Sequence, residues 1–88
     1  MQNENEMQKV KVGMGALLVD AQGLVRLAAE ARVCAYFATS IKRSEELRGP
    51  YYQVTKYFPH LRARADSLAL RLGAERLRRA YEQKRKTS

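Results

Sequence analysis

The chain has 88 residues and a mass of 10.1 kDa, which leaves room for one small domain and excludes a large enzyme with a separate cofactor domain. Apolar residues make up 45% of the chain and charged residues 30%, a balance that excludes wholesale disorder. The 17 Lys and Arg residues outnumber the 9 Asp and Glu residues, and the net charge of +8 favours nucleic acid or an acidic protein surface as the partner. One cysteine and one histidine exclude an intrachain disulfide and a multi-cysteine zinc site, so we expect no metal and no cofactor.

Two apolar stretches, residues 14–19 and 33–38, bear on membrane insertion and targeting. Each has six residues, fewer than the hydrophobic core of a signal peptide and far fewer than the roughly 18 that suggest a membrane span. We therefore expect no membrane partner and a cytoplasmic location.

An apolar stripe with alternating steps of three and four residues predicts a long helical segment over about residues 4–48. This heptad spacing keeps one face of a helix turned toward a partner helix. We expect the stripe to form a seam between subunits, and five of its ten members are small alanines that allow close packing: Met7, Val10, Met14, Leu17, Ala21, Leu24, Ala28, Ala31, Ala35 and Ala38.

The length of this segment leaves two alternatives. A helix of about 44 residues would be roughly 66 Å long, whereas a compact domain of this size has a radius of gyration of about 12 Å. Either the segment breaks near Gly13, Gly15 or residues 20–23, where Asp20 suits a helix N-cap, or it stays continuous and pairs with another chain. Because the stripe runs through Ala21, we predict continuity and a homo-oligomer, most simply a dimer.

A glycine and a proline, Gly49 and Pro50, predict the end of this segment. An aromatic connector over residues 49–58 follows, and Pro59 then suits the first position of a basic helix over about residues 59–85. A short connection brings such a helix back antiparallel to the first. The sequence thus predicts one all-α domain over residues 1–88, a helical hairpin of a long and a shorter helix, completed as an oligomeric bundle.

Arginines recur every seven residues in the basic helix, at Arg64, Arg71, Arg78 and Arg85, which places them along one helical face. We call these four residues the arginine row. Residues 1–44 hold six Lys and Arg against four Asp and Glu, a net +2, while residues 45–88 hold eleven against five, a net +6. Guanidinium groups bind phosphates with two hydrogen bonds, so the row predicts phosphate contacts, extended by Arg79, Lys84 and Lys86.

A solvated helix face is the alternative interpretation of the arginine row. Glu75 can pair with Arg71 or Arg79, and Glu82 can pair with Arg78 or Lys86. The tyrosines of the connector, Tyr51, Tyr52 and Tyr57, have two interpretations as well: they stack on bases, or they cap the end of the helical core.

The sequence contains no arrangement that argues for catalysis, so we expect no enzyme activity and no catalytic residue. We predict a small helical-bundle protein that binds nucleic acid mainly through phosphate contacts. Small regulators from mobile elements offer an analogy in architecture alone. The alternative is a helical adaptor or inhibitor that binds another protein through its alanine-rich or aromatic surface.

Overall fold

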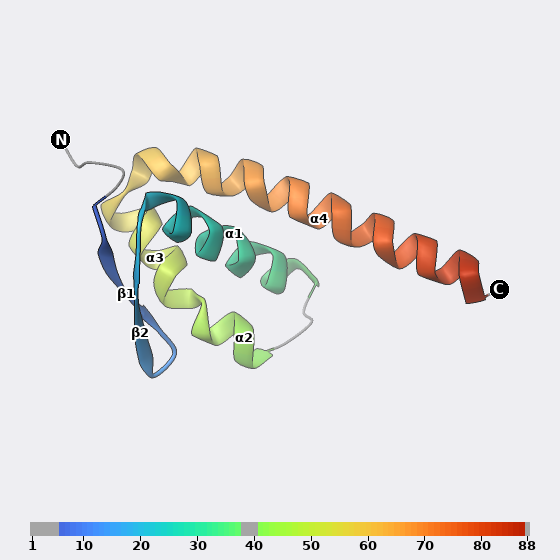
Figure 1. The fold of residues 1–88 in the computed structure, drawn as a ribbon, viewed down its shortest axis with the longest axis horizontal. Helices are drawn as coiled ribbons and strands as arrows, with labels where there is room; N and C mark the ends of the chain where they lie inside the picture. Colours follow the sequence, from blue (N-terminus) through green and yellow to red (C-terminus); the bar gives the residue numbers. More distant parts are fainter. Residues whose placement is uncertain (1–5, 38–40, 88) are drawn as a thin grey trace.

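A computed structural model describes residues 6–37 and 41–87 and shows two strands followed by four helices (Figure 1). In chain order the elements are β1 (Gln8–Val12), β2 (Gly15–Val19), α1 (Ala21–Phe37), α2 (Ile41–Glu46), α3 (Arg48–Tyr57) and α4 (Pro59–Thr87). The hairpin lies at one end of the molecule and the C-terminal end of α4 at the other, along a longest dimension of 52 Å. In the described part of the chain, no helix combines the length and apolar character that a membrane crossing needs.

The strands form an antiparallel hairpin with a two-residue turn at Gly13 and Met14. Gly13 adopts a φ of +62°, a backbone conformation that glycine tolerates and that tight hairpin turns require. Val10 points into the core and is fully buried, whereas its neighbours Lys9 and Lys11 are exposed on the opposite face. The hairpin therefore has one face on the core and one in solvent.

Helix α1 starts immediately after the hairpin because Asp20 caps it. The Asp20 carboxylate accepts a hydrogen bond from the Gly23 backbone N–H at 2.8 Å, and the Asp20 carbonyl accepts one from Leu24 N–H at 2.9 Å. These bonds satisfy backbone donors that a helix start would otherwise leave unpaired.

Helices α2 and α3 carry the chain back, so α4 runs beside α1 in the same direction (Figure 1). The core lies where β1, α1, α3 and α4 meet, and its buried residues are Val10, Leu24, Val25, Ala28, Val54, Phe58, Leu61 and Ala65. Only the first half of α4 contributes to it, because the side chains from Ala74 to Lys86 are all exposed.

The predicted all-α helical hairpin is wrong, because residues 8–19 form the β-hairpin and the segment 4–48 is not one helix. The two longest helices of the described chain, α1 and α4, pack along each other in parallel instead of antiparallel orientation. Residues 49–58, predicted to be an aromatic connector, lie mostly in helix α3. Helix α4 covers residues 59–87, against the 59–85 expected.

The apolar stripe does not form one continuous helical seam, because its members lie in different elements. Met14 and Leu17 belong to the hairpin and are exposed, and Ala21 is the half-buried first residue of α1. Val10 is buried in β1, and Met7 precedes that strand and is exposed. The remaining members lie in α1 or beyond it: Leu24, Ala28 and Ala31 are buried within one chain, Ala35 is exposed, and Ala38 lies outside the described residues. The apolar face that suggested a second subunit is therefore covered in its middle by α3 and α4 of the same chain.

Candidate nucleic-acid interface

Helix α4 carries the arginine row, with Arg64 and Arg71 beside α1 and Arg78 and Arg85 on its projecting half. Its sequence suits an exposed helix, since Pro59 occupies the first position and Ala, Leu, Arg and Glu, which all favour helix, dominate the remaining positions. Its 29 residues correspond to about 43 Å. The C-terminal half projects past the end of α1 (Figure 1).

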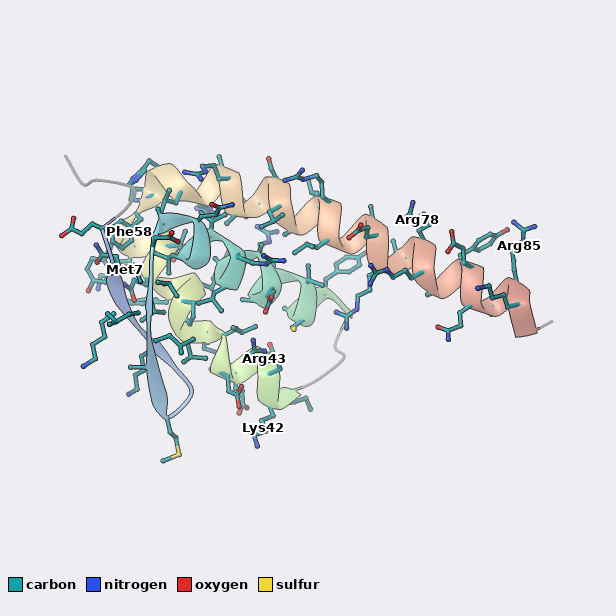
Figure 2. The ribbon with its side chains drawn as sticks, in the orientation of Figure 1. Met7, Lys42, Arg43, Phe58, Arg78 and Arg85 are labelled. Carbon is teal, nitrogen blue, oxygen red and sulfur yellow. The ribbon has the colours of Figure 1, made fainter. Side chains whose placement is uncertain are left out.

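The arginine row follows one side of this helix. Successive members are seven residues apart, which corresponds to about 10.5 Å of rise and a rotation of about 20°. The row from Arg64 to Arg85 therefore spans roughly 31 Å, comparable with about nine base pairs of duplex at 3.4 Å each. All four side chains are exposed, and Figure 2 shows Arg78 and Arg85 pointing to the same side, away from α1.

Two ion pairs near the start of α4 use arginines outside the row. Arg32 Nη1 lies 2.7 Å from Asp66 Oδ1, and Arg62 Nε lies 3.9 Å from Asp66 Oδ2, so two cations share one carboxylate. Within the described residues, neither Arg71 nor Arg78 has a carboxylate at ion-pair distance.

The solvated-face interpretation of the row also included pairs of Glu75 with Arg71 or Arg79 and of Glu82 with Arg78 or Lys86, and it stays an alternative. In the described part of the chain, neither glutamate forms an ion pair with Arg71 or Arg78. The centre of the row therefore carries two exposed guanidinium groups that form no ion pair with these glutamates.

A groove between α1 and α4 adjoins the first half of the row. It has a volume of about 730 Å³, and Arg64 and Arg71 line it from α4. Helix α1 contributes Arg26 and also Asp20, whose carboxylate is already bonded to the Gly23 N–H. The groove thus brings three cations and one anion together along one edge.

Arg26 is the member of this surface that the sequence analysis missed. It lies 38 residues before Arg64, on a helix that the sequence predicted to be antiparallel to α4. Its approach to the row depends on the parallel packing of α1 and α4, which no local pattern encodes. The three further predicted residues, Arg79, Lys84 and Lys86, are exposed on the C-terminal half of α4.

The three tyrosines considered for base stacking lie on α3 in two environments. Tyr51 is half-buried and packs against the core, whereas Tyr52 and Tyr57 are 54% and 62% exposed. Lys56 Nζ donates a hydrogen bond to Tyr52 Oη at 2.9 Å and lies 5.3 Å and 5.5 Å from the ring centres of Tyr52 and Tyr57. The hydrogen bond to Tyr52 and the charge of Tyr57 raise the pKa of Lys56 above its usual 10.5. A role of these rings in stacking stays a prediction.

Exposed guanidinium groups dominate the chemistry of this surface. Among the residues described, no group of three or more His, Cys, Asp or Glu side chains is placed to hold a metal ion. No protein-family model, no curated protein and no solved structure matches the chain.

Proposed function

We propose that this protein binds nucleic acid through phosphate contacts of the arginine row, with Arg71 and Arg78 at its centre. The observation that carries the proposal is the position of these two arginines: both are exposed on α4, Arg71 beside the groove and Arg78 on the projecting half, and no described carboxylate pairs with them. Guanidinium groups in this setting donate hydrogen bonds to phosphate oxygens without breaking an existing ion pair.

Contacts of this kind position a backbone and carry little sequence information, so we expect weak base specificity. Arg26 and Arg64 extend the contact into the groove beside α1. A cytoplasmic location belongs to this proposal. The analogy with regulators of mobile elements does not support it, because that analogy rested on a helical-hairpin bundle that the fold lacks.

Salt dependence tests the proposal directly. Fluorescence anisotropy would measure binding to a labelled duplex of about 20 base pairs, chosen to exceed the length of the row, and to single-stranded DNA and RNA of equal length. The double variant Arg71→Ala/Arg78→Ala should bind more weakly and should reduce the slope of log K against log salt by about 1.8 for a duplex, since each phosphate contact contributes about 0.9.

A matched control tests whether the loss of net charge alone explains the result. The double variant Lys9→Ala/Lys11→Ala removes the same two charges from the exposed face of the hairpin and should leave the slope nearly unchanged. Wild-type affinity and slope in the arginine variant would contradict the proposal. Equal losses in both double variants would assign the binding to net charge and not to the row.

A groove on the other side of α4 favours a second candidate function, an adaptor that binds an acidic amphipathic helix. This groove has a volume of about 470 Å³, and Tyr36, Leu70 and Leu77 line it while being 79%, 76% and 56% exposed. The net charge of +6 over residues 45–88 complements an acidic partner. Binding through this groove would be far less sensitive to salt than phosphate contacts, and the uncharged substitution Leu70→Ser would weaken it while leaving the charge of α4 unchanged.

A further inference from the structure

Strand β2 is an edge strand that residues 6–37 and 41–87 leave uncovered. Its residues 15–18 are exposed and Val19 is half-buried. Strand β1, in contrast, is covered on its outer side by α3, because a Cβ on Gly49 would lie only 2.5 Å from the carbonyl oxygen of Lys11. The hairpin therefore has one protected edge and one open edge.

The register shows which backbone groups the open edge presents. A two-residue turn closes on a hydrogen-bonded pair, here Val12 and Gly15, and the bonding then alternates along an antiparallel ladder. The N–H and C=O groups of Ala16 and Leu18 consequently point away from β1. The same alternation directs the Lys11 carbonyl outward from β1, in agreement with its position against Gly49.

The side chains along this edge are apolar. No charged residue occurs between Gly15 and Val19, and Leu17 and Leu18 are 49% and 67% exposed on the two faces of the strand. Open edge strands are ordinarily protected by a charge, a proline, a bulge or a covering segment, because their backbone groups form a template for another strand. Strand β2 carries none of the first three, and the described elements leave it uncovered.

We propose that a second copy of this chain pairs with β2 in antiparallel orientation, about a two-fold axis through Leu17. Ala16 of each copy then faces Leu18 of the other in hydrogen-bonded pairs, which makes four backbone hydrogen bonds across the axis. Leu17 faces its own counterpart in the closer, non-hydrogen-bonded type of pair.

The absence of charge on β2 favours a second copy of the same strand as its pairing partner. The chain carries a net charge of +8, so self-repulsion opposes association least where the meeting surfaces are uncharged. Strand β2 meets this condition, whereas pairing through β1 would place Lys9 and Lys11 of both copies together and would displace α3. An acidic strand would find no cation on β2 to pair with.

Sedimentation equilibrium of the full chain without nucleic acid tests this dimer, and its outcome is independent of the proposed function. The wild type should shift with concentration from 10.1 kDa toward twice that mass. The variant Leu17→Lys places two ammonium groups at the axis and should raise the dimer dissociation constant at least about 100-fold, since opposed like charges cost several kcal/mol. The variant Ala16→Pro removes an outward N–H while leaving the β1–β2 bonds intact, and it should also be monomeric.

A control and a second measurement make the result decisive. Leu70→Lys, the same change at an exposed position of α4, should dimerise like the wild type. Hydrogen exchange of the wild type should show the amides of Ala16 and Leu18 becoming protected as concentration rises, which needs no variant to fold. A wild type that stays monomeric, a Leu17→Lys dimer as tight as the wild type, or unprotected Ala16 and Leu18 amides in a dimer would each overturn the proposal.

Discussion

The contact between α3 and β1 allows a stability prediction that rests on one methyl group. Gly49 is the second residue of α3, and a Cβ at this position would lie 2.5 Å from the backbone oxygen of Lys11. An ordinary van der Waals contact begins near 3.4 Å, so Gly49→Ala requires α3 and β1 to separate by about 0.9 Å, the difference between the two distances. Because the obstacle is a backbone carbonyl, no side-chain rotation relieves it.

Two effects of opposite sign decide the outcome of Gly49→Ala. Replacing glycine within a helix by alanine stabilises it by up to about 1 kcal/mol. A gap of 0.5–1 Å forfeits roughly a quarter to a half of the dispersion attraction across it, and overpacking costs about 1–3 kcal/mol. The steric cost exceeds the gain, so we expect a net loss of about 1–2 kcal/mol, which lowers Tm by roughly 4–16 °C in a domain of this size.

Thermal and urea denaturation followed by circular dichroism measure this loss. Gly73→Ala provides the matched control, because Gly73 lies in the middle of α4 beside an open groove and should gain up to about 1 kcal/mol from the same substitution. A Gly49→Ala protein as stable as the wild type would refute the close approach of α3 to β1.

Two further predictions concern the cap of α1 and the lysine on α3. Asp20→Ala removes the acceptor of the Gly23 N–H and should lower the unfolding free energy by about 1 kcal/mol in urea denaturation, whereas Asp20→Asn should retain most of it; equal losses in both variants would contradict the capping role. Tyr52→Phe removes the hydrogen-bond acceptor of Lys56, so an NMR titration should find the pKa of Lys56 lowered toward 10.5. Because the pKa of Lys56 is raised in the folded state, the stabilisation from its charged form is fully present below pH 10.5 and is lost as the pH rises through the folded pKa. An unchanged titration of Lys56 in Tyr52→Phe would show that Tyr52 is not the cause of the shift.

The hairpin was not predicted because one of its cross-strand pairs has the same sequence spacing as a heptad repeat. Val10 and Leu17 are seven residues apart, the spacing of successive positions along one helical face. In the fold they are direct cross-strand partners, since a two-residue turn at Gly13 and Met14 places residues 10 and 17 opposite each other. Gly13 and Asp20 were the correct signals for the turn and for the start of α1, and the apolar stripe outweighed them in the prediction.

The connector illustrates a limit of proline as a signal. Gly49 and Pro50 predict a helix end, yet Pro50 lies in the first turn of α3, where its missing N–H costs nothing because the first turn lacks intrahelical acceptors. Pro59, in contrast, marks the first residue of α4 as its sequence position suggests. Both prolines therefore lie in the first turn of a helix, and neither ends one.

The arginine row could be read from the sequence because it depends on the periodicity of one helix alone, whereas its neighbour Arg26 depends on how two helices pack. The division of α4 into a packed and a projecting half follows from the same distinction. Leu61 and Ala65 pack the first turns of α4 into the core. This packing offsets the unfavourable free energy of nucleating a helix that would be only marginally stable in isolation. The exposed residues beyond Gly73 then extend this helix by propensity, without packing to dictate their identity. Where packing imposes no constraint, the sequence is free to carry charge, and a helix held at one end presents that charge to solvent along its outer side.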